Sequence, residues 1–234
     1  AVARRLVAAG IRVYGQGRKP SALAALSSHG IVPVAADLSH RTEVAALFSV
    51  PGGISYVVHC AALSSPWGTY DEFYRANVTA TELVADAALA AGTERFIHIS
   101  TASIYSAKFH RRAIREDADL PARKVSGYGE TKRLSEAALD ARIARGLWAV
   151  KIRPLDVLGP NDATVFPRLL RLARKGFIPV LPEGDAETDF TPVDNVVDCI
   201  LAALTASAEI GGRAYNVTNG EPITIPTVLR MLHS

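Results

Sequence analysis

The sequence predicts an α/β protein of the doubly wound class, in which helices cover both faces of a parallel sheet. Helical patterns end at Gly10, Gly30, Gly92 and Gly146, and an apolar strand follows each glycine. These strands are continuous apolar runs, which is typical of parallel strands buried on both faces. The composition, 49% hydrophobic with 21% charged residues, is that of a globular protein with a sizeable core.

The first half of the chain alternates helices and strands. We expect helices over about 1–9, from residue 41, and over about 70–91, and strands at 11–14, 31–35, 57–58 and 96–99. Gly15 and Gly17 are interpreted as the turn after a strand. A doubly wound fold needs a strand before its first helix, so we expect ~10 to 15 residues with a Gly-rich turn to precede Ala1. The alternative is that the chain never had them and holds pyrophosphate poorly.

The second half begins with a long charged connection over 106–125, which we expect to cover a substrate. A helix over 128–144 and a strand over 147–152 follow. Beyond Gly159 we expect a helix at 166–175, a short strand near 178–181, a helix at 196–204, a strand at 214–217 and a helical start at 225–232. We therefore predict a dinucleotide-binding domain over 1–160, incomplete at its start. Residues 161–234 would hold the remaining sheet elements interleaved with a small C-terminal substrate domain that continues past Ser234.

Charge and composition exclude several classes of protein. The net charge of +3 comes from 26 basic residues scattered among 23 acidic ones, without the basic stripe of a nucleic-acid binder. No apolar run approaches the ~18 residues of a transmembrane span. The six histidines are dispersed, so no metal site is predicted. Cys60 and Cys199 look like buried small hydrophobes, which fits a reducing cytoplasm.

The candidate chemistry lies between Ser100 and Lys132. A run of hydroxyl side chains follows the strand that ends at Ile99, and Tyr128 and Lys132 stand four residues apart on the next helix. That spacing places both on one helix face. A phenol has a pKa near 10, so a nearby ammonium is needed to lower the pKa of Tyr128 toward neutrality. A Ser or Thr hydroxyl opposite would hold a carbonyl oxygen.

These residues resemble a known family. The Tyr128/Lys132 pair, the hydroxyl run and the segments 57–62, 77–78, 151–154 and 189–196 together resemble the extended short-chain dehydrogenases/reductases, the NAD(P)-dependent epimerase/dehydratase family. Within it the chain is similar to bacterial 3β-hydroxysteroid dehydrogenase-like and 2-alkyl-3-oxoalkanoate reductases. The resemblance implies a Rossmann-type fold and carbonyl/alcohol redox on a hydrophobic 3-oxo acyl or sterol-like substrate.

The resemblance also implies residue roles. Thr101 would bind the substrate oxygen, Tyr128 would transfer the proton, and Lys132 would hold the nicotinamide ribose. The expected cofactor contacts are Arg18, Lys19, Asp37, Leu38, Cys60, Ala61, Ala62, Tyr128, Lys132, Pro154 and Leu155, and the expected substrate contacts are Ser64, Trp67, Ser103 and Phe166. Two alternatives stay open: Asp37 as a cap of the following helix, and Trp67 as ordinary loop packing.

The turn after residue 14 carries Arg18 and Lys19 and no acid, which favours the 2′-phosphate of NADP(H), with NAD(H) as the alternative. A nucleotide-sugar epimerase or dehydratase remains a second interpretation, although Ala102 and Ser103 stand where a dehydratase would need an acidic pair. A non-catalytic dinucleotide-sensing protein is the third. The family implies a homodimer.

Overall fold

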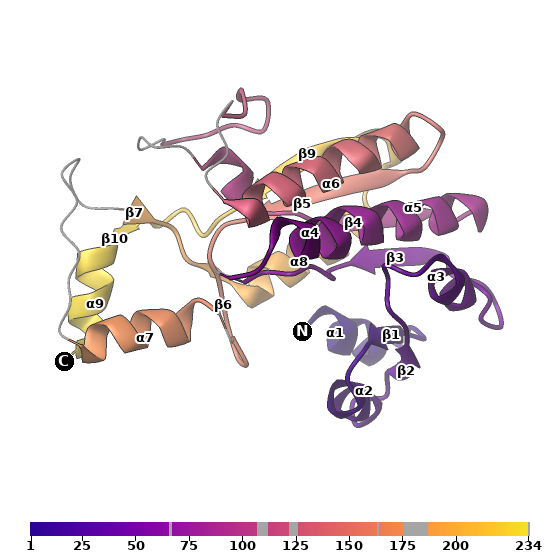
Figure 1. The fold of residues 1–234 in the computed structure, drawn as a ribbon, viewed down its shortest axis with the longest axis horizontal. Helices are drawn as coiled ribbons and strands as arrows, with labels where there is room; N and C mark the ends of the chain where they lie inside the picture. The colour runs from indigo at the N-terminus through magenta and orange to yellow at the C-terminus, as the bar shows by residue number, and fades with distance from the viewer. Residues whose placement is uncertain (66, 107–111, 122–125, 163, 176–186, 234) are drawn as a thin grey trace.

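The computed structural model describes residues 1–65, 67–106, 112–121, 126–162, 164–175 and 187–233. Its centre is a four-stranded parallel sheet (Figure 1). The strand order is β3 (Tyr56–His59), β4 (Arg95–Ile99), β5 (Ala149–Pro154) and β9 (Ala214–Val217). A separate parallel pair consists of β1 (Tyr14–Gly17) and β2 (Val32–Ala35).

Helices cover both faces of the sheet, because neighbouring residues of a strand point to opposite faces. On β4, Phe96 joins one apolar cluster and Ile97 joins the other. The Phe96 cluster packs against α3 (Arg41–Phe48), α5 (Ala80–Ala90) and α6 (Gly127–Ile143), and the Ile97 cluster against α1 (Val2–Ala8) and α8 (Val193–Thr205). The predicted doubly wound α/β fold is therefore confirmed.

The C-terminal part alternates between the main sheet and a smaller unit. Helices α7 (Phe166–Arg174) and α9 (Ile225–His233) pack together around Leu169, Ala173 and Leu229, and they lie to one side of the sheet in Figure 1. The two-stranded pairs nearby are β6 (Val157–Leu158) with β8 (Thr191–Pro192), and β7 (Glu187–Thr188) with β10 (Ile223–Thr224). The domain boundary at residue 160 stays a prediction, and the strand expected near 178–181 lies outside the described residues.

The first strand begins later than its apolar pattern predicted. It runs over Tyr14–Gly17, so Gly15 and Gly17 are strand residues rather than a turn. Close packing explains why a glycine occupies this strand position, since a Cβ on Gly15 would come within 2.7 Å of Ile31 Cγ2 and 2.9 Å of Leu26 Cδ1. The absence of side chains there lets α2 (Pro20–Ser27) and the segment that enters β2 pack directly on the strand.

The helix expected over 70–91 contains an irregular turn. After α4 (Tyr70–Tyr74), a π-helical turn spans Arg75–Thr79 before α5 begins. Thr69 and Glu72 form a reciprocal capping box at the start of α4. The π turn points Asn77 into the protein, where it bonds Leu63 in both directions and Thr131 on α6.

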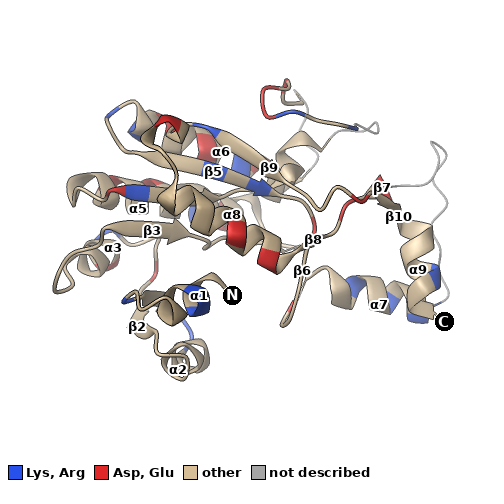
Figure 2. Ribbon diagram, turned by 180° about the vertical axis from the view of Figure 1, so that it is seen from behind, with Lys and Arg blue, Asp and Glu red and all other residues tan. Residues whose placement is uncertain are grey.

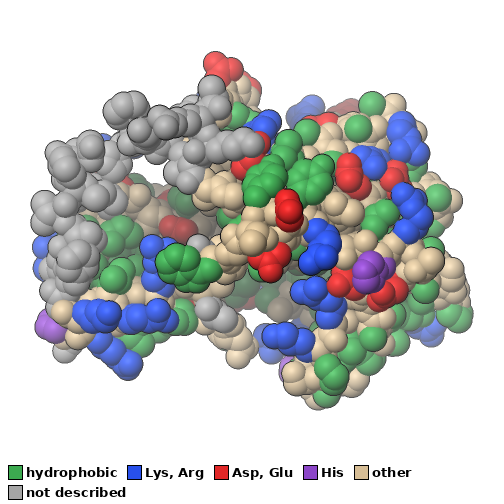
Figure 3. Space-filling view, in the orientation of Figure 1, with side chains coloured by type: hydrophobic (Ala, Val, Ile, Leu, Met, Phe, Trp, Pro, Cys, Tyr) green, Lys and Arg blue, Asp and Glu red, His purple; other side chains and the backbone are tan. Residues whose placement is uncertain are grey.

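Charges of both signs are mixed over the surface. In Figure 2 some helices carry charges of one sign, with basic residues on α1, α7 and α9 and acidic residues on α8, and both signs appear on the face shown in Figure 3. In the part of the chain that the structure describes, no helix is long and apolar enough to cross a membrane.

Candidate active site

The candidate site lies where the parallel strands β3, β4 and β5 end, because the carboxyl ends of parallel strands meet at one edge. Directly after β4, Thr101 caps a short 3₁₀ helix, Ala102–Tyr105. Its hydroxyl accepts a bond from Ser103 N at 3.1 Å and donates to Ser103 Oγ at 3.1 Å. The hydroxyl run predicted from sequence is therefore an ordered array at the sheet edge.

Helix α6 brings Tyr128 to this array. Ser126 caps the helix by accepting a bond from Gly129 N at 3.0 Å. Gly129 allows the close approach, since a Cβ there would lie 2.8 Å from the Ser103 carbonyl oxygen. The half-buried Tyr128 lies close enough to the Ser64 and Thr101 hydroxyls for both to affect its pKa. Three residues predicted from separate segments therefore meet at one phenol.

Lys132 lies one turn further along α6 and is 1% exposed. Its Nζ donates to the Ile99 carbonyl oxygen at 2.8 Å and lies 3.3 Å from His98 Nε2. Burial lowers the pKa of Lys132 to about 8, and Glu136 and Cys60 oppose this shift. At neutral pH the ammonium is therefore charged. It has three N–H donors, of which the described acceptors take two.

The electrostatic relation between Tyr128 and Lys132 differs from the prediction. Burial raises the pKa of Tyr128 above 10, and the nearby Ser64 and Thr101 hydroxyls oppose this shift only in part. The Lys132 ammonium is directed at β4, so the expected lowering of the Tyr128 pKa by Lys132 is not seen. A phenol with a raised pKa stays protonated at neutral pH, which suits a proton donor.

Small residues follow β3 at the sheet edge where the candidate site lies. Cys60 and Ala62 are exposed and Ala61 is partly exposed. Cys60 is thus not the buried hydrophobe that was predicted. So many protein atoms surround its thiol that burial nevertheless raises its pKa to about 11. These side chains fit a flat cofactor because none is larger than a thiol.

The structure brings the predicted adenosine-end residues together. Arg18 NH1 bonds Asp37 Oδ2 at 3.3 Å, and Asp37 Oδ1 accepts from Ser39 N at 2.9 Å. Bonds from Ser39, and to a smaller extent Arg18, lower the pKa of Asp37 to about 2. Asp37 is therefore not the cap of α3, whose N-cap is His40. Lys19 is exposed at the start of α2.

Two expected cofactor segments offer mainly backbone. The side chain of Leu38 is buried in the Phe96 cluster and presents little surface. Pro154 ends β5 as a buried residue, and Leu155 N bonds Val217 O at 3.1 Å. Thr191 Oγ1 donates to Leu155 O at 2.6 Å. The segment expected to meet a nicotinamide amide is therefore fixed from β8 and β9.

The four predicted substrate residues divide into two groups. Ser64 and Ser103 belong to the hydroxyl array around Tyr128 and Thr101. Trp67 is 83% exposed, so the alternative of ordinary loop packing is wrong. Phe166 is exposed at the start of α7, and the contacts described for α7 are with α9 rather than α6. The structure therefore does not join Trp67 or Phe166 to the tyrosine.

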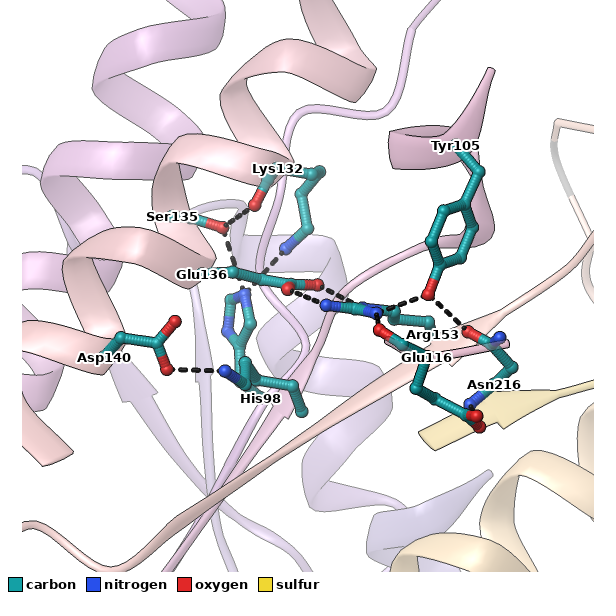
Figure 4. Close-up of polar contacts among 10 residues, drawn as sticks. His98, Tyr105, Glu116, Lys132, Ser135, Glu136, Asp140, Arg153 and Asn216 are labelled. Carbon is teal, nitrogen blue, oxygen red and sulfur yellow. Dashed lines mark hydrogen bonds and ion pairs between the residues drawn. The ribbon is translucent and has the colours of Figure 1, made fainter. Parts of the chain in front are cut away.

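A buried ionic network was missed from sequence. Glu136 receives two bonds from Arg153 of β5, at 2.9 and 2.6 Å, and Arg153 also bonds Tyr105 Oη and the Glu116 carbonyl oxygen (Figure 4). Tyr105 Oη donates to Asn216 Oδ1 at 3.1 Å. One signal was available: Arg153, like Lys151, is a charged residue in a strand whose other residues are apolar.

The same face of α6 carries three charged residues at four-residue spacing. Lys132 meets β4, Glu136 meets Arg153, and Asp140 meets Lys151 of β5 with Nζ 2.5 Å from Oδ1.

The described residues contain no group of three or more His, Cys, Asp or Glu that could hold a metal ion. Fold and site together define a Rossmann-type enzyme of the short-chain dehydrogenase kind, with Thr, Tyr and Lys at the sheet edge.

Comparison with known proteins identifies the family. The chain belongs to the NAD dependent epimerase/dehydratase family, whose model matches residues 1–218. It is 30% identical to 2-alkyl-3-oxoalkanoate reductase of Stenotrophomonas maltophilia over 99% of this chain and 70% of that protein. It is 35% identical to the mouse decarboxylating sterol-4-alpha-carboxylate 3-dehydrogenase, over 78% of this chain and 52% of the enzyme. The predicted class, an NAD(P)-dependent oxidoreductase, is thus confirmed.

A solved structure agrees with this assignment. The Bacillus cereus UDP-glucuronic acid 4-epimerase, in complex with UDP-glucuronic acid and NAD, superposes with a TM-score of 0.81. It is 25% identical and the match covers 99% of this chain and 77% of that one. The Rossmann-type fold predicted from sequence is therefore the fold of an NAD-binding protein.

Proposed function

We propose that the protein reduces the carbonyl group of a hydrophobic substrate, of 3-oxo acyl or sterol-like type, with NADPH. The observation that carries this proposal is the arrangement at the sheet edge, where the Thr101 and Ser64 hydroxyls lie near the Tyr128 phenol. The buried ammonium of Lys132 lies one turn away on the same helix. A substrate carbonyl oxygen placed beside the phenol would take the place of one of these hydroxyls. It would then receive the proton of the Tyr128 hydroxyl.

Thr101, Tyr128 and Lys132 have different parts in the proposed reaction. Thr101 holds the substrate oxygen and orients it toward the Tyr128 hydroxyl, which donates a proton as the oxygen gains charge. The raised pKa of Tyr128 keeps that proton on the phenol at neutral pH, as a proton donor in carbonyl reduction requires. Lys132 offers its remaining N–H donor and its charge to the ribose side. NADPH would supply the hydride, held at residues 60–62, 154–155 and Lys132.

The hydrophobic substrate class is supported by two features. The mouse and Stenotrophomonas relatives are named for sterol and alkyl substrates. The exposed Trp67 lies on the loop that also carries Ser64, so this loop offers apolar surface to a substrate. The preference for NADPH rests on Arg18, whose side chain is 70% exposed and can meet a 2′-phosphate while remaining near Asp37.

The test is NADPH oxidation by the full-length gene product with 3-oxo acyl, steroid and sugar-nucleotide substrates. Tyr128→Phe should bind NADPH as the wild type does and lose ~100-fold or more in kcat. Tyr56→Phe is the matched control, because this exposed phenol lies at the start of β3. Undiminished turnover by the Tyr128 variant would refute the mechanism.

An epimerase acting on a nucleotide sugar is the second candidate, favoured by the likeness to the UDP-glucuronic acid 4-epimerase. Such an enzyme regenerates its cofactor in each turnover, so the purified protein would retain it, whereas a reductase exchanges it with the solution. Dialysis followed by absorbance spectroscopy distinguishes them. Cofactor binding without turnover on any substrate would favour the third interpretation, a dinucleotide-sensing protein. The homodimer and the cytoplasmic location stay predictions, of which light scattering tests the first.

A further inference from the structure

The mechanism leaves one buried group beside Lys132 unused. His98 is the last residue but one of β4 and is 0% exposed. Its Nε2 is 3.3 Å from Lys132 Nζ and 3.1 Å from Ser135 Oγ, so two side chains of α6 compete for one nitrogen (Figure 4). Which contact is a real hydrogen bond follows from counting the hydrogens.

Donor and acceptor rules favour the lysine. An ammonium can only donate, so its contact with Nε2 requires a lone pair there. Ser135 has a single hydroxyl hydrogen, and this is used for the Lys132 carbonyl oxygen at 2.7 Å. The hydroxyl therefore does not compete for the lone pair, and the Lys132 contact favours the tautomer with the ring proton on Nδ1.

Other charges keep His98 neutral. Burial lowers its pKa well below 6.5, and the positive charges of Lys132 and Lys151 and the ring of His59 lower it further. His59, from β3, is stacked on His98 with ring centroids 5.5 Å apart. The acidic group near the ammonium is Glu136, bound to Arg153, and the Cys60 thiol is also nearby. His98 thus acts as an acceptor rather than as a second cation.

A proton relay through His98 does not fit the geometry. Nδ1 is buried and has no hydrogen-bond partner among the described residues. A proton that entered at Nε2 would have no route out from Nδ1. What remains is a fixed acceptor, adjacent in sequence to the Ile99 carbonyl that takes a second N–H of Lys132.

We propose that His98 is a positioning residue for Lys132: its neutral ring accepts a hydrogen bond at Nε2 and, with the Ile99 carbonyl oxygen, sets the direction of the third N–H. This deepens the proposed function, because it assigns a device that aims Lys132 at the ribose. It also explains why a histidine occupies this buried strand position. An aliphatic residue would fill the same space and would not leave a nitrogen such as Nδ1 without a hydrogen-bond partner.

The direct test is the ring tautomer, read by long-range ¹H–¹⁵N spectra of the histidine-labelled chain. We expect the proton on Nδ1 in the wild type and in Ser135→Ala. In Lys132→Met the ring should change to the Nε2–H form, which can donate to Ser135 Oγ. A wild-type ring protonated on Nε2 would overturn the proposal. This measurement needs no substrate, so its result is independent of the proposed activity.

The functional test compares His98→Gln, whose amide oxygen can replace the acceptor, with His98→Phe, which cannot. Without an acceptor the charged form of Lys132 is less stable. The alkaline limb of carbonyl reduction should therefore move to lower pH by ~1 unit in His98→Phe, with kcat reduced ~10-fold. His98→Gln should restore most of both, and melting curves check that each variant folds. Equal behaviour of the two variants refutes the positioning role, whereas full activity of Lys132→Met refutes the proposed function instead.

Discussion

The two ends of the proposed cofactor site are built in opposite ways. At the nicotinamide end Lys132 is 1% exposed, and Glu136 and Arg153 form a buried ion pair beneath it. At the adenosine end Arg18 and Asp37 form a pair on the surface, with the arginine side chain 70% exposed. The proposed chemistry thus depends on buried charges, which solvent does not screen. Cofactor choice depends on exposed charges, which solvent does screen.

Breaking the buried end should have the largest effect on stability. Glu136→Gln leaves the Arg153 charge buried without a full partner, which is expected to cost ~3–5 kcal/mol of unfolding free energy. Urea denaturation measures it. The double variant Glu136→Leu/Arg153→Met removes both charges and should lose much less than the single one. A loss of under ~1 kcal/mol in Glu136→Gln would show that the two ends do not differ as described.

The buried histidines should make the nicotinamide end sensitive to acid. Burial lowers the pKa of His59 to about 3, with Lys132 adding to the shift. The folded state then binds fewer protons than the unfolded state between pH 6.5 and 3, so stability is lost as the pH falls through this range, by up to ~1.4 kcal/mol per pH unit for this group.

His59→Gln tests this effect, because an amide can still donate to Thr81 Oγ1, now 3.1 Å from the His59 ring nitrogen. Its unfolding free energy, measured from pH 7 to 4, should fall less steeply than that of the wild type. Ser28→Ala, at an exposed serine whose hydroxyl donates to the Ala25 carbonyl oxygen, serves as the control and should follow the wild-type slope below pH 6.5. Parallel curves for the wild type and His59→Gln would contradict the assignment.

Changes at the exposed end should alter cofactor choice with little effect on stability. Arg18→Ala is expected to raise the KM for NADPH ~10-fold and to leave the KM for NADH nearly unchanged. Lys19→Ala, at the exposed neighbour with no described ion-pair partner, should have a smaller effect. Equal changes for both cofactors would indicate that the Arg18 side chain does not meet a 2′-phosphate.

Sequence reasoning succeeded where local pattern and burial agree. The apolar runs around Phe96 and Ala149 are buried strands, and the four-residue spacing of Tyr128 and Lys132 does place both on α6. It failed for Gly15, where close packing of a helix, not a turn, explains the glycine. The pattern of residue types along the sequence does not show which neighbouring residues pack against a glycine.

The site shows the same limit. Thr101, Ser64 and Tyr128 meet as expected, but the Lys132 ammonium points to the Ile99 carbonyl oxygen and the pKa of Tyr128 rises. Helical spacing specifies a shared face and not the direction of a flexible four-carbon side chain. The pairing of Glu136 with Arg153 also depends on the register between α6 and β5, which no local signal specifies.

The π turn over Arg75–Thr79 restricts how the chain length of this segment can vary. It holds one more residue than an α-helical turn would, and so sets the angular phase between α4 and α5. Deleting a residue there would restore regular winding and rotate Asn77 by ~100° relative to α5, away from Leu63 and Thr131. Length changes in this segment should therefore be harmful even where every substitution is tolerated.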